Sequence, residues 1–350
     1  MKGASLFQRV SCTLLYSEYT FNIHSSGTNI ANMINKKQDA IVGKYQPKKK
    51  QNLKLYEFIE KKLSEGGREL FKECSTFNQF ISTRDKEKSK LIASNSCKNR
   101  FCPICAWRKA CKDAMKIATL MEAIKFEENK EFLFLTLTTP NIKGDEVRSE
   151  IDRFNKAFNK LFKRRNIARS IKGYIRKLEM TYNKERDDYN PHFHVLLCVD
   201  KSYFKKKELY IKQKEWLSMW QEVTDLSEIT QVHIQKVELI KEGNAVAEVA
   251  KYSAKDYEMA TSQEVFDVFY SGLKGRQLIV YSGVFKEYAL KYENEELDKY
   301  KSKDKSEYFY KILVIWNPDL LKFNREYIEL TEEEKEKYNG HFIDELEVEK

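Results

Sequence analysis

Apolar and polar residues in the middle of the chain follow a pattern that predicts alternating strands and helices. Residues 131–139 (EFLFLTLTT) are rich in aromatic, β-branched and threonine residues and stop at Pro140, which is typical of a strand. Residues 145–165 repeat apolar side chains at helical spacing, with lysines off that stripe. The same criteria predict strands at 172–182, 192–199 and 231–239, and helices at 206–221 and 244–257.

The resulting order, β-α-β-β-α-β-α, predicts an α+β fold. It matches a split βαβ arrangement of ferredoxin-like or RRM-like topology, in which helices pack on a central antiparallel sheet. The central strands of such a sheet present one face on which a site can form. Further along the chain, 270–285 suggests turns around a strand, and 311–316 (KILVIW) predicts another strand. We expect these segments to form an appended α+β part.

The predicted strand that begins at 192 (HFHVLL) has two histidines one residue apart. Because side chains alternate between the faces of a strand, His192 and His194 point the same way and can bind one metal ion. Glu179 lies on the preceding strand and reaches the same face if the two strands pair as a hairpin. Two imidazoles and a carboxylate suit a divalent cation with open coordination positions. The alternative is three half-exposed sheet residues without a ligand.

A tyrosine on the last predicted helix is a candidate nucleophile. Glu248 and Tyr252 lie four residues apart and therefore share a helix face, and Lys251 and Lys255 form a second such pair beside them. Tyr257 is rotated from Tyr252 by about 140°. A tyrosine on an amphipathic helix is usually a packing residue, which is the alternative interpretation of Tyr252.

Cysteines cluster at 97–105 (CKNRFCPIC). Cys97, Cys102 and Cys105 have the tight spacing of a zinc knuckle, and their thiolates predict a structural Zn²⁺ site that requires a fourth ligand. Cys74 is the first choice, because the intervening chain is long enough for a β-hairpin to return, and Cys111 is the alternative. The odd total of seven cysteines fits metal binding in a reducing compartment better than a disulfide framework.

The charge of the chain favours a polyanionic partner. The net charge is +10 and the pI is near 9.0, which points most simply to nucleic acid. Residues 153–178 contain ten basic residues and no acidic one, whereas 331–350 hold eight acidic residues and three lysines. The candidate DNA contacts, for which a solvated helix face is the alternative, are Lys156, Lys160, Lys163, Arg164, Arg165, Arg169 and Lys255.

The N-terminal part of the chain, which includes Lys48-Lys49-Lys50, is interpreted as a loosely ordered basic arm. No apolar run approaches the ~20 residues that span a bilayer, and the N-terminus lacks a convincing signal peptide. We therefore expect a cytoplasmic protein with no membrane partner.

Three motifs in order carry a family resemblance. They are 134–141 (FLTLTTPN), 192–197 (HFHVLL) and Glu248-x-x-Lys251-Tyr252. Their order and spacing resemble the motifs of HUH endonucleases and, more narrowly, of the replication initiator (Rep) proteins of small rolling-circle plasmids from Gram-positive bacteria. The similarity extends from about Cys97 to Tyr257 and on to the segment 272–285. Many relatives have a further histidine where this chain has Asn190, which leaves the outer-shell role of that histidine in doubt.

The resemblance implies a nicking chemistry. Such proteins bind the plasmid double-strand origin, expose its nick site as a single strand or hairpin, and cut one strand by attack of a tyrosine. The products are a 5′-phosphotyrosine and a free 3′-hydroxyl that primes the host DNA polymerase. Tyr252 matches the family's nucleophile and Glu248 the carboxylate that activates water for the terminating cleavage, while Lys251 would help position the phosphate.

The implied cofactor at the histidine site is Mg²⁺ or Mn²⁺, since nitrogen ligands favour Mn²⁺ in affinity and abundance favours Mg²⁺. The family role also implies a host helicase and a single-strand DNA-binding protein as partners, and a homodimer is a further option. Two other interpretations stay open. One is an HUH transposase or relaxase-like nickase, and the other is a non-catalytic, zinc-containing DNA-binding regulator in which the histidine pair and Tyr252 are structural.

These inferences divide the chain into parts. We expect a basic N-terminal arm at 1–65 and a zinc-binding element with a leading helix at 66–127. An HUH endonuclease core follows at 128–270, and a C-terminal α+β extension with an acidic tail occupies 271–350.

Overall fold

A computed structural model describes residues 40–237, 249, 255–301 and 303–340. The described residues form two compact units. The large unit takes its described residues from 110–300, and the small unit combines those of 40–109 with those of 301–340. From residue 40 to residue 340, the chain therefore starts in the small unit, builds the large unit, and returns to the small unit.

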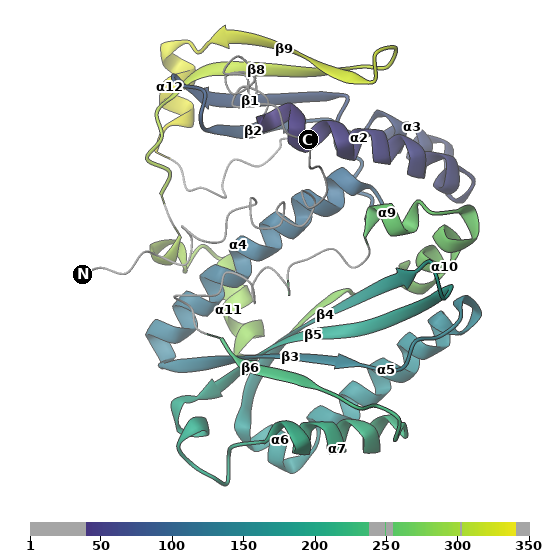
Figure 1. The fold of residues 1–350 in the computed structure, drawn as a ribbon. Coiled ribbons are helices and arrows are strands. Elements are labelled where there is room, and N and C mark those ends of the chain that lie inside the picture. The colour runs from purple at the N-terminus through teal and green to yellow at the C-terminus, as the bar shows by residue number, and fades with distance from the viewer. Residues whose placement is uncertain (1–39, 238–248, 250–254, 302, 341–350) are drawn as a thin grey trace, which may run out of the picture. The chain divides into compact units, whose positions relative to one another are not determined.

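A five-stranded sheet forms the centre of the large unit (Figure 1). Its strands are all antiparallel and lie in the order β6-β3-β5-β4-β7. When β3 to β6 are numbered one to four in chain order, they lie side by side in the order four, one, three, two. This is the split βαβ order that the sequence predicts. The bounds are β3 Lys130–Thr138, β4 Ile171–Asn183, β5 Asp188–Asp200, β6 His233–Lys236 and β7 Ile279–Gly283. The predicted α+β fold class is confirmed.

Helices α5 (Val147–Phe162) and α7 (Gln213–Thr224) pack on one face of this sheet. The ring of Phe154 stacks on Phe193 of β5 with centroids 4.3 Å apart, and Trp220 of α7 meets Phe154 edge-on at 5.1 Å. Because Phe193 points away from its neighbours His192 and His194, both histidines face the other side of the sheet.

The described helices cover only part of that other face. Helix α4 (Pro103–Glu128), from Ala114 onward, and helix α11 (Val284–Glu293) bury the sheet residues Phe132, Phe134, Ile175 and Leu196 in one apolar core. The core includes none of the polar residues at the other end of the same strands. The polar end of this face is where the candidate site lies.

The sheet takes a strand from beyond residue 270, the end that we predicted for the core. Helix α10 (Gln263–Leu273) leads to β7, which pairs with β4, so the strand predicted in 270–285 is an edge strand of the central sheet. Gly283 ends β7 with φ of 56°, and a Cβ there would lie 2.2 Å from the carbonyl oxygen of Lys172. Only glycine fits this close crossing of β7 and β4.

The second predicted helix starts later than expected. Residues 201–204 form a short 3-10 helix, and α7 begins at Gln213, where the Glu215 carboxylate accepts a hydrogen bond from the backbone N–H of Lys212. This cap by the glutamate side chain fixes the start of the helix. The remaining short elements of the large unit are η4 Gly144–Glu146, α6 Arg165–Ser170, α9 Asp256–Met259 and η6 Asp298–Tyr300.

The small unit has its own four-stranded sheet, in the order β2-β1-β8-β9. A hairpin of β1 (Phe77–Thr83) and β2 (Ser89–Ser94) pairs through β1 with β8 (Tyr308–Asn317), which then pairs with β9 (Lys322–Glu329). The strand predicted at 311–316 lies within β8. The helical elements of this unit, besides the first turns of α4, are α2 Ala40–Ile59, η3 Glu60–Lys62, α3 Glu65–Glu73 and α12 Glu332–Tyr338.

Helix α2 replaces part of the loosely ordered arm that we expected. Tyr45 packs edge-on against Phe80 and Trp107, with ring centroids 5.4 and 5.2 Å away. Lys48 and Lys49 are buried, although a run of three lysines usually marks a solvated segment. The helix forms because its apolar side chains pack on the hairpin and because Lys49 finds buried acceptors, which sequence periodicity does not reveal.

Candidate functional site

Glu179, His192 and His194 lie together on two adjacent strands of the large unit. Glu179 of β4 is directly opposite His192 of β5, and Thr138 of β3 is opposite His192 on its other side. The Glu179 Oε2 atom lies 3.1 Å from His194 Nε2 and 3.7 Å from His192 Nε2. One ligand atom from each of the three residues falls within 4.8 Å of the other two, a spacing that could hold a metal ion.

Neighbouring polar groups orient both histidine rings, and the neighbour of His192 also sets its tautomer. The Nδ1 atom of His192 lies 3.0 Å from the carbonyl oxygen of Asn190, which can only accept a hydrogen bond. Nδ1 therefore carries the proton, and in the neutral ring the Nε2 lone pair faces Glu179. The His194 Nδ1 atom lies 3.4 Å from the Thr136 hydroxyl, and the His194 ring stacks on Phe134. Both rings thus present Nε2 to the same point.

The environment of Glu179 fits a cation. Only 5% of this residue is exposed, and its Oε2 atom has no hydrogen-bond partner among the described residues. Burial alone would raise the pKa of Glu179, but the two imidazoles beside it hold that pKa well below its usual range. Hydrogen bonds and positive charge from the imidazoles cause this lowering of the pKa, and a divalent ion that replaced their Nε2 protons would likewise keep the buried carboxylate ionised.

The structure adds Glu258, a carboxylate that sequence reasoning missed. Glu258 is 8% exposed, accepts a hydrogen bond from the backbone N–H of Tyr182, and lies 3.7 Å from the Lys255 ammonium. Burial acts most strongly on Lys255 and opposes its charge, but the Glu258 carboxylate and the neighbouring Tyr257 and Glu179 together outweigh it, so the pKa of Lys255 is raised. Glu179 adds to this shift, so Lys255 lies in the field of the candidate metal ligand. The sequence gives no motif at Glu258 from which this could be found.

The candidate nucleophile and its helix partners, Glu248, Lys251 and Tyr252, lie outside the described residues. Val249 between them is helical and buried in the core that α4 and α11 form on the sheet. Their roles therefore stay predictions from the sequence.

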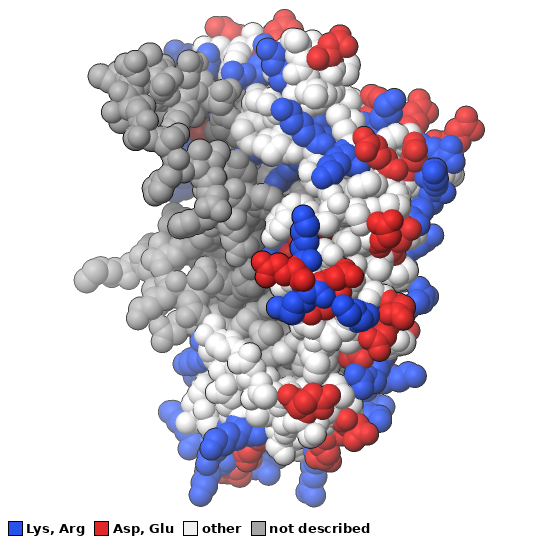
Figure 2. Space-filling view, turned by 45° about the vertical axis from the view of Figure 1, so that its right-hand side comes forward, with Lys and Arg blue, Asp and Glu red and all other residues white. Residues whose placement is uncertain are grey.

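The predicted basic stretch lies on the opposite side of the sheet from the histidines. It belongs to α5 and α6, and Arg164 is paired with Glu222 at 2.6 Å, whereas most of the other basic residues of the stretch are exposed. On the face drawn in Figure 2, basic and acidic side chains are interspersed and form no continuous basic surface. The stretch therefore does not share a surface with the histidines, and its role in DNA binding stays a prediction.

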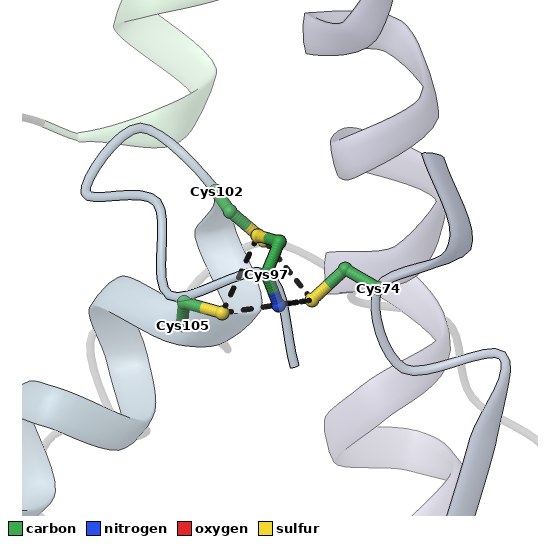
Figure 3. A group of neighbouring side chains, drawn as sticks. All are labelled: Cys74, Cys97, Cys102 and Cys105. Carbon is green, nitrogen blue, oxygen red and sulfur yellow. Dashed lines mark hydrogen bonds between the residues drawn. The ribbon is translucent and has the colours of Figure 1, made fainter. Parts of the chain in front are cut away.

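The small unit holds the second cluster of candidate ligands. Figure 3 shows Cys74, Cys97, Cys102 and Cys105 pointing toward one another. Cys74 ends α3, and the β1–β2 hairpin then returns the chain to Cys97, as the spacing predicts. Cys111 lies further along α4 and is not in the cluster.

The sulfur positions fit a tetrahedral metal site. The Sγ atoms of Cys74 and Cys105 are 3.5 Å apart, those of Cys97 and Cys105 are 3.6 Å apart, and those of Cys74 and Cys102 are 3.6 Å apart. Four sulfurs at the usual distance from a tetrahedral zinc ion would be about 3.8 Å from one another. Burial and the adjacent sulfurs raise the pKa of Cys102, so all four thiols cannot ionise together unless a cation compensates them.

A buried lysine lies beside these thiols. Lys49 of α2 has no exposed surface, and its ammonium donates to the carbonyl oxygens of Lys72 at 2.6 Å and Cys74 at 2.9 Å. Asn52, one turn further along α2, donates to the carbonyl of Phe71 and to Cys102 Sγ at 3.5 Å. The cluster therefore has a positive charge and an amide donor next to its sulfur ligands.

Comparison with known proteins identifies the family. A family model described as "Replication protein" matches residues 88–328, which cover the Glu179–His192–His194 cluster, three of the four clustered cysteines and most of both sheets. The chain belongs to this family of Rep replication proteins. The resemblance to plasmid Rep initiators that the three motifs suggest is thereby confirmed.

Individual relatives agree with this assignment. A "Protein rep" from Staphylococcus aureus is 54% identical over 213 residues, which cover 61% of this chain and 93% of the relative. A "Protein rep" from Bacillus amyloliquefaciens is 35% identical over 259 residues, covering 66% of this chain and 76% of the relative. One from Streptococcus pneumoniae serotype 2 is 33% identical over 255 residues, covering 70% and 79%. No solved structure matches the chain.

The Rep-family protein is thus a plasmid replication protein of the initiator type, and its family binds plasmid origin DNA. Within the described part of the chain, no helix is both long and apolar enough to cross a membrane.

Proposed function

We propose that this Rep-family protein starts rolling-circle replication as an HUH endonuclease that nicks one strand of its plasmid's double-strand origin. The observation that carries the proposal is the buried Glu179–His192–His194 cluster, whose three ligand atoms face one point. Replication by the rolling-circle route starts with a nick, and among the described residues this nitrogen- and oxygen-ligand cluster is the one suited to Mg²⁺ or Mn²⁺.

The cluster would hold the ion against the scissile phosphate. A divalent cation there, Mg²⁺ or Mn²⁺, would polarise the phosphate and stabilise the leaving 3′-oxygen. His192 and His194 keep their Nε2 atoms in place through Asn190 and Thr136, and Glu179 supplies the negative charge. Lys255 adds a positive charge close to the same carboxylate.

Tyr252 is the proposed nucleophile. A tyrosine hydroxyl is protonated at neutral pH, so it loses its proton as its oxygen attacks phosphorus. The bond from phosphorus to the 3′-oxygen breaks, and that oxygen leaves and takes up a proton. The result is a 5′-phosphotyrosine on the protein and a free 3′-hydroxyl that can prime DNA synthesis, with Lys251 positioning the phosphate.

Glu248 is proposed to end the cycle. As a general base it would activate water for the second cleavage, which avoids a second covalent link and so prevents immediate reinitiation. The partners in this scheme are the origin as a single strand or hairpin, host helicase, polymerase and single-strand DNA-binding protein, all in the cytoplasm.

The proposal predicts a covalent protein–DNA product. When the wild-type protein is incubated with single-stranded oligonucleotides from the origin and Mn²⁺, we expect an adduct that resists denaturation and a released strand with a 3′-hydroxyl. The adduct should disappear when EDTA replaces Mn²⁺. Tight DNA binding without an adduct in any metal would instead favour a non-catalytic DNA-binding regulator.

We further propose that the four cysteines of the small unit bind a structural Zn²⁺. Four thiolates and one zinc ion carry a net charge of −2, which makes the buried Lys49 the adjacent compensating charge. Such a site would join the end of α3, the β1–β2 hairpin and the start of α4 in an element with a small apolar core.

Replacing Lys49 by methionine tests this arrangement. We expect the zinc content to fall and the free energy of unfolding to drop by about 3 kcal/mol, because two carbonyls lose a buried donor and the zinc–thiolate charge loses its counter-charge. Elemental analysis of protein purified without chelator and denaturant unfolding would measure both. Lys50→Met, at the exposed neighbour, is the matched control. Wild-type zinc content and stability in Lys49→Met would contradict this role of the lysine.

A further inference from the structure

A polar pocket of about 540 Å³ opens beside the candidate metal centre, wholly within the large unit. Its walls come from the ends of β3, β4 and β5 and from the loop that precedes β6. The lining residues are Thr138, Thr139, Pro140, Asn141, Thr181, Tyr182, Asn183, Arg186, Asn190, Glu228, Ile229, Thr230 and Gln231. Neither the family match nor the relatives' names assign a ligand to it.

The pocket continues the face of the sheet that carries the metal ligands. Thr138 is opposite His192, and the next pair on that face along β4 and β5 is Thr181 with Asn190. Asn190 connects the two sites, because its carbonyl oxygen contacts His192 Nδ1 while its side chain lines the pocket. Asn190 and His192 are two residues apart on a strand, about 7 Å. A DNA strand whose phosphate lies at the metal centre therefore reaches the pocket within about two nucleotides.

The lining has the chemistry of base recognition. Amides and hydroxyls predominate, and the Tyr182 ring offers an aromatic surface. The charged residues do not favour phosphate, since Arg186 is paired with Asp188 at 2.8 Å and Glu228 adds a negative charge. Amide and carboxylate groups pair instead with the donor and acceptor edges of bases.

The pocket contains a buried hydroxyl, that of Thr139, for which the described residues provide no partner. Thr139 is 5% exposed, and its Oγ1 atom has no hydrogen-bond partner among the described residues. The neighbouring Thr138 hydroxyl, in contrast, donates to Asn190, and Asn190 donates to the Thr139 carbonyl and to Asn141. A buried hydroxyl costs stability when it is unpaired, so its presence in a binding pocket points to a ligand that completes it.

We infer that this pocket binds one unpaired nucleobase of the strand that is cut, close to the scissile phosphate, with the Thr139 hydroxyl as one of its hydrogen-bonding groups. The inference rests on the proposed nicking function and deepens it by naming the part of the substrate that the site reads. Asn190 is a positioning residue that links base binding to the orientation of His192.

Abasic scanning of the strand tests the inference. Single-stranded oligonucleotides covering the origin, each with one abasic residue, are titrated in EDTA so that no cleavage occurs. For the wild type we expect one position near the nick at which the abasic residue weakens binding about tenfold. Thr139→Val should weaken binding of the intact oligonucleotide about five- to tenfold and reduce the effect of the abasic residue at that same position.

The control variants separate binding from folding. Thr139→Val should unfold at or above the wild-type temperature, because it removes an unpaired buried hydroxyl, and Thr139→Ser should restore binding. Gln231→Ala in the pocket should weaken binding, whereas Gln263→Ala on α10 should not. Equal effects of every abasic position in wild type and Thr139→Val would overturn the inference. Nicking of the same intact oligonucleotide in Mn²⁺ reports separately on the proposed function, so the two can fail independently.

Discussion

Glu179→Gln will abolish metal-dependent nicking, with a loss of about a thousandfold or more. Glutamine keeps the size of the side chain but removes the charge of a buried oxygen that faces two imidazoles. Because the ion supplies several kcal/mol of transition-state stabilisation, its loss lowers the rate by this factor. The measurements are the nicking rate on the origin strand and Mn²⁺ binding by titration calorimetry, and both should fail together.

The matched control is Glu185→Gln, an exposed carboxylate in the turn between β4 and β5. It should nick and bind Mn²⁺ as the wild type does. Glu179→Gln should also keep a near-wild-type unfolding midpoint, since it removes a buried charge and no packing volume. If Glu179→Gln retained both Mn²⁺ binding and nicking, the cluster would not be the metal centre.

Tyr252→Phe will remove the covalent protein–DNA adduct and the nick. The phenylalanine ring keeps the packing of tyrosine but has no oxygen to attack phosphorus, so no rate remains for this step. The assay is the denaturation-resistant adduct on a labelled origin oligonucleotide, with binding measured in parallel. Tyr257→Phe, at a 54% exposed tyrosine on α9, is the control and should form the adduct normally.

A second variant, Glu248→Ala, tests whether the first and the terminating cleavage use different groups. Glu248→Ala should leave the first cleavage and the adduct intact and impair only the terminating cleavage, because water and not tyrosine is activated there. An adduct formed by Tyr252→Phe would show that another residue is the nucleophile. A loss of the first cleavage in Glu248→Ala would remove the proposed division of roles.

The parts of the protein that the sequence predicts well are those fixed by local rules. Alternation along a strand puts His192 and His194 on one face, and a single hairpin brings Glu179 opposite His192. The same reasoning placed Cys74 near Cys97, since the only requirement was a hairpin between them. The Glu179–His192–His194 cluster thus depends on contacts between neighbouring strands, and the cysteine cluster depends on one hairpin that reverses the chain.

The parts that the sequence does not predict depend on partners far away in the chain. Strand β7 joins the central sheet beside β4, which 270–285 alone cannot indicate because an edge strand and a separate strand have the same local pattern. Lys49 is buried because carbonyls of Lys72 and Cys74 accept its protons. A run of lysines predicts solvated side chains at each of its positions, so only the tertiary structure shows that Lys49 is buried. The pocket beside the candidate metal centre is likewise formed by three strand ends and a loop.

The pairing of β1 with β8 has a consequence for the order in which the protein is made. Ribosomes release the β1–β2 hairpin and its cysteines early, but the strand that completes β1 follows only after the whole of the large unit. Until then one side of β1 offers unpaired backbone groups, a template on which other nascent chains can pair. Metal capture by the cysteines would keep the hairpin folded during this interval. Translation products that stop before β8 would carry an open strand edge and be prone to aggregate.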